Sequence, residues 1–588
     1  MRSILCSALC LGLACSAARP VATEEKRSKA AIESSLVESL RAEHLALGRI
    51  QSVMGWYEGT QGEESLGQLT YARRGQLFNK SAVEAVGRAS GAPGLSSNEA
   101  LALRFLRRAL AGETVSLATA RFDDEYANTE AAATALLPGL PSGQSVAYRD
   151  LPLLLGAEPD AARRRELFAA MTRVIESSLN PILERKEAAA QLAAHDTGFA
   201  DYVALSEELR AVKLEPLLAQ GVLYVQSTQA IFEALLDRVA REELGIARTE
   251  LRLCDLTRLW KAPKLAAHFD KALELKALGF FLSGIGLDLH TAAGGEVRID
   301  DSLNPKKRPR AFVDPIDAPR DVRLSIKPTG GLDDYWTLFH EAGHAVHFAS
   351  TTIEPAELVT LGHGAPTEAF GEFFRHAFSD PRFLLRYRDF LVAQGRPAPT
   401  NAELAAVLRR TALVEMLYLR RYAFAKIAYE LRLHGRPLQS LQPALLLLPH
   451  PERVQGDDAG SLRELYRQLF SAAYTFELSD EEAQRFRTDV DDNFYSADYA
   501  RAFALAGMMH AGIRRRFGEE WYGNKQVGQF LRGQLFAQGE SLSAEEVAGR
   551  LGFPPRVDFA LSARRAAQLV EDADFLEKRP QAGYPLPR

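Results

Sequence analysis

Apolar residues recur every three or four positions along most of the chain beyond residue 30, a spacing that predicts amphipathic α-helices. The stretch 98–112 adds an asparagine at its start and a glycine at its end, which are helix start and stop signals. A longer stretch, 400–437, begins with Thr400 and Glu403 at capping-box spacing and closes with a glycine and a proline. At 1.5 Å per residue, that helix would span roughly 50 Å. The pattern therefore predicts a mainly α-helical protein with a large body.

One short segment departs from the helical pattern. In 321–327 apolar and polar residues alternate, which is the period of a half-buried strand, and a proline ends it. A glycine-containing turn follows, in which an aspartate can cap the next helix. A strand with a free edge can bind an extended peptide through its backbone, so Arg323 and Ser325 on its polar face are candidate substrate-binding residues. A purely structural hairpin is the alternative.

The composition is that of a soluble globular protein. The chain has 588 residues, of which 47% are hydrophobic and 25% charged, and its formal net charge is −5. This charge, together with the absence of a basic stripe with interleaved aromatic residues, argues against nucleic acid as a partner.

The N-terminus has the pattern of an export leader. An apolar run at 4–14 follows an arginine and precedes small residues, and it is too short to span a membrane as a mature helix. Cleavage can follow the small residues 16–18, or 13–15 can act as a lipoprotein box with Cys15 carrying the lipid. We expect a periplasmic or secreted protein, either free or attached to a membrane only through Cys15; a mis-assigned start is the alternative. Cys254 is the single cysteine beyond the leader, so it cannot form an intramolecular disulfide.

The candidate metal-binding and catalytic residues lie in the string HEAGH, which contains His340, Glu341 and His344. Histidines four residues apart lie on one face of a helix, so both imidazoles can reach one metal ion. A glutamate directly after the first histidine lies beside that metal, where it can take a proton from water. Two imidazoles and a carboxylate suit zinc. The string therefore predicts a site for one zinc ion, which requires a third protein ligand.

Two downstream glutamates offer that ligand and its support. His347 shares the face of the histidine pair, but about 10.5 Å of helix axis separate it from His340, so we expect it to be packed or to play a supporting role. The stretch 362–378 predicts a turn followed by a helix, with Glu368 in the first turn and Glu372 one turn later. If this helix crosses the first, Glu368 reaches the metal and Glu372 accepts a hydrogen bond from a ligand histidine. A solvated helix face is the alternative for both.

These residues resemble the thimet oligopeptidase and oligoendopeptidase F family, and the related angiotensin-converting enzyme family. In those enzymes a His-Glu-x-x-His helix is followed, nearly thirty residues later, by a metal-binding glutamate. Here Glu368 follows His340 by 28 residues, and the resemblance is strong over 310–380. It implies a helical ellipsoid with a deep channel that admits short peptides, and one zinc ion bound by His340, His344 and Glu368.

A second match covers 491–507. Tyr499 matches the family tyrosine that hydrogen-bonds the oxyanion, and the resemblance places Tyr495 nearby, as a candidate substrate-binding residue. Asn493 stands where the family often has a histidine; it can still donate a hydrogen bond to a substrate, although not a charged one.

The implied activity is hydrolysis of peptide bonds in short peptides, with Glu341 assisting the attack of water. Trimming of peptide ends, as by a dipeptidyl carboxypeptidase, and a peptide-binding relative with weak catalysis are the alternatives. We divide the chain into a leader at 1–18, an N-terminal helical part at 19–300 and a catalytic helical part at 301–588, and we expect a monomer.

Overall fold

The computed structural model describes residues 21–62, 67–71, 74–137, 145–304, 306–308, 310–456 and 458–579, with only the backbone given for 21–32 and residue 76. The predicted leader and Cys15 lie outside these residues. Among the described helices, none is both long and apolar enough to cross a lipid bilayer.

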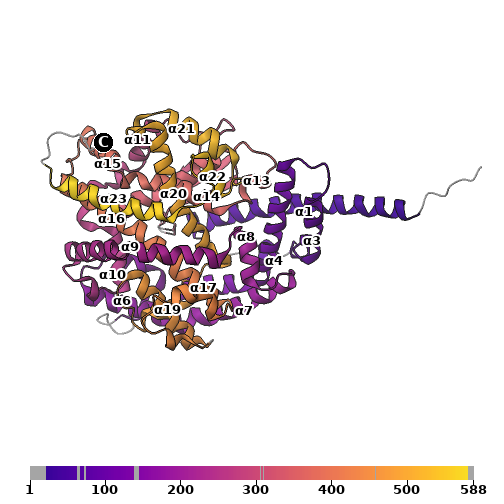
Figure 1. Ribbon diagram of the computed structural model, residues 1–588, viewed down its shortest axis with the longest axis horizontal. Coiled ribbons are helices and arrows are strands. Elements are labelled where there is room, and N and C mark those ends of the chain that lie inside the picture. Colours follow the sequence, from indigo (N-terminus) through magenta and orange to yellow (C-terminus); the bar gives the residue numbers. More distant parts are fainter. Residues whose placement is uncertain are drawn as a thin grey trace, which may run out of the picture.

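The body consists of helices packed on helices, which confirms the mainly α-helical prediction (Figure 1). Its N-terminal half contains α1 (Val21–Gln61), α2 (Gly67–Tyr71), α3 (Lys80–Ser90), α4 (Ser97–Ala132), α5 (Leu151–Ala157), α6 (Ala161–Val174), α7 (Asn180–Asp196), α8 (Tyr202–Arg210), α9 (Leu214–Leu244), α10 (Leu253–Lys261) and α11 (Glu274–Ile285). Its C-terminal half contains α12 (Leu332–Ala349), α13 (Glu357–Thr360), α14 (Gly364–Arg375), α15 (Pro381–Ala393), α16 (Asn401–Leu419), α17 (Ile427–Leu433), α18 (Gln442–Leu445), α19 (Ala459–Tyr474), α20 (Tyr495–Phe517), α21 (Gln526–Phe530), α22 (Ala544–Arg550) and α23 (Phe559–Glu577).

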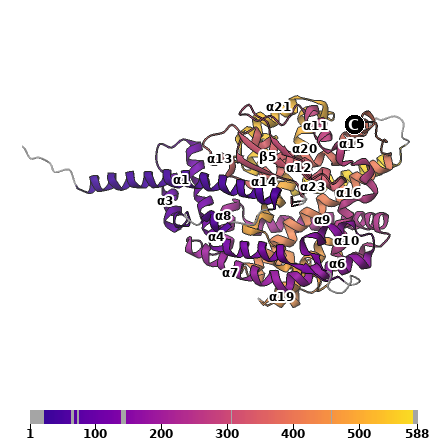
Figure 2. The ribbon, with the colours of Figure 1, turned by 180° about the vertical axis from the view of Figure 1, so that it is seen from behind.

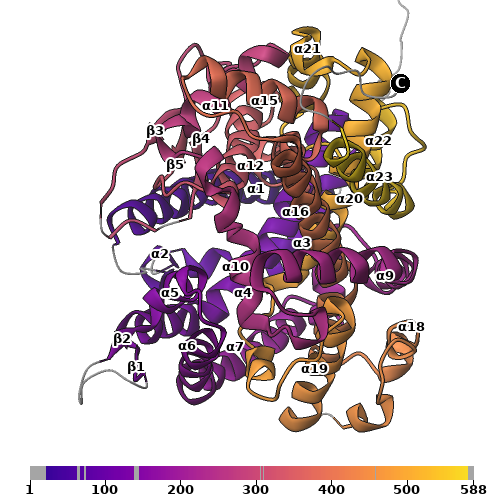
Figure 3. The same ribbon diagram turned by 90° about the vertical axis from the view of Figure 1, so that its left-hand side faces the viewer.

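In space the helices form two groups, with α9 and α16 between them. One group contains α11 to α15 and α20 to α23, and the other contains α4 to α8 with α17 and α19 (Figures 1 and 3). The N-terminal end of α1 projects from the body, whereas its C-terminal part packs on β4 (Figure 2). Contacts cross residue 300, since α9 packs on both α16 and α23. The division at residue 300 stays a prediction.

The long helix predicted at 400–437 is present, with one distortion. Thr400 and Glu403 form the expected capping box at its start, and the helix continues from α16 through a π-helical segment, Arg420–Lys426, into α17. A π-helical segment rotates the residues after it relative to an α-helix and is frequent at functional sites. Here it contains Tyr422, which lines the cavity described below.

The helix predicted at 98–112 is correct in type but wrong at both ends. Ser96 caps it by accepting a hydrogen bond from the Glu99 backbone N–H at 3.1 Å, and α4 runs through Gly112 to Ala132. A glycine inside a helix costs only about 1 kcal/mol relative to alanine, so the tertiary packing of α4 against α3 and α7 outweighs this stop signal.

A small sheet lies next to α12 and contains the predicted strand. The strands β3 (Arg298–Asp300), β5 (Asp321–Ser325) and β4 (Phe312–Asp317) pair in the order β3-β5-β4, and β1 (Thr134–Ala135) pairs separately with β2 (Val146–Ala147). The expectation that the 321–327 strand has a free edge is wrong, because β5 pairs in parallel with β3 and antiparallel with β4. The outer strand beside the candidate site is therefore β4.

Candidate metal centre and catalytic site

Two glycines allow α12 and α14 to cross closely. A Cβ atom added at Gly343 would lie 2.5 Å from the carbonyl oxygen of Phe370, and one added at Gly371 would lie 2.8 Å from the His340 ring. These distances are shorter than any real Cβ contact, so a side chain at either position would force the helices apart. This close crossing brings the first turn of α14 to the histidine pair of α12.

The Gly343→Ala substitution is therefore expected to destabilise the protein by about 1–3 kcal/mol, the usual cost of overpacking, and to weaken metal binding. Chemical denaturation and zinc titration measure the two effects. Gly279→Ala in α11 is the matched control, because no described atom lies within 4 Å of its added Cβ. The control is expected to be neutral or stabilising, because alanine has the higher helix propensity. Equal stability of the two variants would contradict the close crossing.

The ligand atoms predicted from the sequence converge. His340 Nε2 and His344 Nε2 lie 3.0 Å apart, and Glu368 Oε2 lies 3.4 Å from the first and 3.7 Å from the second. Ligands at 2.0–2.1 Å from a tetrahedral zinc ion are separated by roughly 3.3 Å from one another. Glu368 Oε2 is buried without a hydrogen-bond partner in the described structure. The geometry and this unpaired oxygen fit a metal ion bound by His340, His344 and Glu368.

The electrostatics of the cluster also favour a bound cation. Burial alone would lower the pKa of His340, but the carboxylates of Glu368 and Glu372 raise that pKa to about 10. Burial and the neighbouring His340 lower the pKa of His344 to about 4. Burial would raise the pKa of Glu368, yet the two imidazoles lower it to about 2. Without a metal ion, His340 therefore holds a proton between the buried carboxylates of Glu368 and Glu372. A divalent cation could replace this proton.

Glu372 and Tyr495 hold the converging side chains in place. Glu372 Oε1 lies 3.0 Å from His340 Nδ1, and the Arg375 Nε atom donates to Glu372 Oε2 at 2.7 Å. Glu372 thus lies behind His340, where a carboxylate can orient a histidine that binds a metal. Tyr495 was expected to contact substrate, but its hydroxyl donates to Glu368 Oε1 at 2.6 Å, so it orients this carboxylate instead.

Glu341 and Tyr499 lie at the same centre. Glu341 is buried, and burial raises the pKa of its carboxyl to about 7 against the opposing effects of His340 and Arg310. The backbone N–H of Val313 in β4 also lowers the pKa of Glu341, less than His340 and Arg310 do. Tyr499 is half-buried and its ring stacks on Tyr422 with centroids 4.9 Å apart.

A cavity of about 220 Å³ lies beside this centre and is lined by both His340 and Tyr499. His340, Glu372, Arg375 and Tyr499 contribute to its wall, together with four further aromatic side chains: Trp260, Trp336, Tyr418 and Tyr422. The hydroxyl of Tyr499 has no hydrogen-bond partner in the described part of the chain, so it is free to donate to a bound molecule.

Three other predicted residues lie away from this cavity. His347 is completely buried, its Nε2 lies 3.1 Å from the Gly539 carbonyl oxygen, and burial lowers its pKa to about 3, so it is a packed neutral histidine as expected. Arg323 donates to both carboxylate oxygens of Asp321, and Ser325 is completely buried. The expectation that Arg323 and Ser325 meet substrate is corrected, because their strand is central in the sheet.

Asn493 also takes a different position from the one expected. Its backbone is left-handed, with φ 50°, its N–H donates to the Tyr202 hydroxyl at 2.7 Å, and its carbonyl accepts from Arg210 Nε at 2.9 Å. It lines a separate cavity of about 560 Å³ together with Tyr495. Asn493 does not line the 220 Å³ cavity, so it does not replace a histidine donor there.

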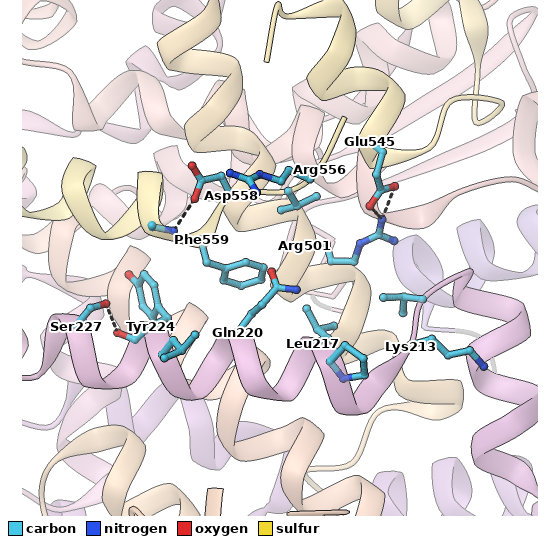
Figure 4. A pocket seen from close by; sticks show the side chains of 15 residues that line it. Lys213, Leu217, Gln220, Tyr224, Ser227, Arg501, Glu545, Arg556, Asp558 and Phe559 are labelled. Atoms are coloured by element: carbon cyan, nitrogen blue, oxygen red, sulfur yellow. Dashed lines mark hydrogen bonds and ion pairs between the residues drawn. The ribbon is translucent and has the colours of Figure 1, made fainter. Parts of the chain in front are cut away.

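A larger cavity, of about 710 Å³, lies between α9, α20 and α23 (Figure 4). Leu217 and Tyr224 line it from α9, and Arg501 forms an ion pair with Glu545 at its wall. Its lining includes none of His340, His344 and Glu368, so size alone does not locate the reactive centre.

The sequence matches no protein-family model and no curated protein. Among solved structures, the chain is similar to a "putative Oligoendopeptidase F", with 15% sequence identity and a TM-score of 0.59. The alignment covers 93% of this chain and 96% of that chain. The two chains share a fold. The resemblance in sequence is strong only over 310–380, whereas the similarity in structure covers almost the whole chain.

Sequence reasoning missed several residues of the site. Arg310, Tyr418 and Tyr422 line the cavity but were not predicted. The two tyrosines are four residues apart on one helix, so the sequence indicates that they share a helix face. It does not indicate which other segment this face contacts. Arg310 carried no signal, because it lies in a basic, proline-containing stretch that resembles an ordinary surface loop.

Proposed function

We propose that this protein is a zinc-dependent peptidase that hydrolyses peptide bonds in short peptides, in the manner of an oligoendopeptidase. The observation that carries the proposal is the convergence of His340, His344 and Glu368 beside the buried carboxylate of Glu341. The shared fold with a protein described as an oligoendopeptidase F supports it.

His340, His344 and Glu368 would hold the zinc ion. When bound there, zinc would supply Lewis acidity, lowering the pKa of water and polarising the scissile carbonyl. Glu341 accepts the proton of the attacking water and returns it to the leaving amine. Tyr499 donates a hydrogen bond to the carbonyl oxygen as this atom gains negative charge.

The outer strand β4 is the element that we expect to align the substrate. This strand packs on α12, the helix that carries Glu341, and its Val313 N–H lowers the pKa of that glutamate. An extended peptide that pairs with β4 would have its backbone fixed beside Glu341 and Tyr499. This alignment supplies the orientation on which the reaction rate depends.

The partners and location belong to the same proposal. Short peptides are the substrates, and the chain acts as a monomer. The leader predicted at 1–18 would direct it to the periplasm or outside the cell, either free or attached to a membrane only through Cys15.

A mixed pool of short peptides, incubated with the zinc-loaded protein and read by mass spectrometry, tests the activity. We expect internal cuts that a chelator abolishes and that added zinc restores. Products that lack only their terminal residues would indicate end trimming, whereas an unchanged pool with measurable peptide binding would contradict the peptidase and favour a binding protein.

A further inference from the structure

We propose that Arg310 binds a carboxylate group of the substrate next to the reacting centre. This inference rests on the proposed peptidase function and deepens it, because it names the substrate feature that the site selects. A peptide offers this group from its C-terminus or from an aspartate or glutamate side chain.

The first argument is the location of Arg310. It lies directly before β4, the strand whose Val313 N–H lowers the pKa of Glu341, and it lines the same 220 Å³ cavity as His340 and Tyr499. The groups that act most strongly on its charge are Tyr499 and Glu341, which raise its pKa although burial opposes them. The Arg310 side chain therefore lies at the predicted catalytic centre.

The second argument is that Arg310 has no partner. Within the described part of the chain it forms no ion pair and no hydrogen bond, and its side chain is exposed to the cavity. The other arginines nearby differ, because Arg375 in the same cavity is bound by Glu372, and Arg308 in the same loop pairs with Glu58. A guanidinium has five N–H donors in a planar fork, and those of Arg310 remain available to a ligand.

The third argument is the chemistry of the surrounding wall. A planar guanidinium binds a carboxylate through two parallel hydrogen bonds, which add geometric specificity to the attraction of the charges. Tyr418 and Tyr422 can add hydroxyl donors. The lining also contains Lys261, which forms no ion pair in the described chain, and Asp333, whose pKa burial raises and Lys261 lowers. The unpaired guanidinium of Arg310 is therefore the group of this wall that favours an anionic ligand over a neutral or cationic one.

Paired peptides test the proposal. One pair differs only in a free C-terminal acid or amide, and another only in a glutamate or glutamine near the scissile bond. We measure kcat/KM for each on the zinc-loaded wild type, and we titrate each into the zinc-loaded Glu341→Gln protein by calorimetry, where a peptide can bind without being cut. We expect the wild type to prefer the carboxylate form of one pair by about 10- to 100-fold, the factor for a hydrogen bond to a charged group. The pair that shows this preference identifies the source of the carboxylate.

Two variants and a matched control complete the test. Arg310→Gln is expected to lose the preference in both kinetics and binding, whereas Arg310→Lys keeps part of it as a single point charge. Arg308→Gln removes a positive charge from the same loop outside the cavity, and it is expected to leave the preference unchanged.

The opposite results would overturn the inference. Equal losses for the acid and the amide in Arg310→Gln would mean that Arg310 acts only through Glu341. No preference in the wild type, in rate or in affinity, would mean that no carboxylate is bound. Selective binding without cleavage of any peptide would support the role of Arg310 and contradict the peptidase function instead.

Discussion

Peptide hydrolysis by the Glu341→Gln variant is expected to fall by about 10²- to 10⁴-fold, the usual contribution of a positioned general base. Glutamine has the size of the glutamate but cannot accept a proton from water at neutral pH. The substitution also removes a buried charge without leaving a cavity, so folding and zinc content are expected to remain unchanged. Single-turnover cleavage of a fluorogenic peptide, with zinc quantified in the same sample, measures the effect.

The exposed Glu176 provides the control for this substitution. Glu176→Gln makes the same chemical change far from the cluster and is expected to keep full activity. Near-normal hydrolysis by zinc-loaded Glu341→Gln would show that another group accepts the proton, and it would remove the central residue of the proposed mechanism.

Loss of a metal ligand is expected to have the second large effect. In Glu368→Ala the two imidazoles lose the carboxylate that completes the cluster. We expect zinc affinity to fall by more than the roughly 10- to 100-fold that follows loss of an outer hydrogen-bonding partner. Activity at limiting zinc should disappear, and zinc should no longer raise the Tm, because stabilisation by a ligand depends on its affinity for the folded state. Zinc titration and thermal unfolding with and without zinc measure these effects.

Glu372→Gln is expected to weaken zinc binding less than Glu368→Ala does. Its side chain contacts His340 Nδ1 rather than the cluster, so zinc binding should weaken without being lost. His450→Ala, which removes an exposed histidine, should change neither zinc affinity nor Tm. Normal zinc binding by Glu368→Ala would contradict the three-residue site.

The features predicted successfully from the sequence depend on short-range order. The spacing of His340 and His344 places both on one face of α12 whatever surrounds that helix, and the capping box at Thr400 operates within one turn. Glu368 was within reach because only the single-turn helix α13 lies between α12 and α14, and elements that are close in sequence are usually adjacent in space.

The errors arose where distant segments decide the outcome. A strand pattern in 321–327 does not reveal how many neighbours the strand has, and pairing with β3 and β4 makes it central. Tyr495 and Asn493 lie two residues apart and line the same separate cavity, yet only Tyr495 donates to Glu368, and the backbone between them is left-handed at Asn493 and Phe494. No local pattern indicates either result.

The sequence by itself determined the helical character of this protein, the imidazole pair and the glutamate beside it, because helical periodicity fixes which side chains share a face over a few residues. Only the tertiary structure decided which groups surround that pair. Close packing at Gly343 and Gly371 brings Glu368 into the cluster, and the cavity wall gathers Arg310, Tyr422 and Tyr499 from separate segments. Packing and sheet pairing depend on the whole chain at once, and for this reason the site, unlike its first helix, required the fold.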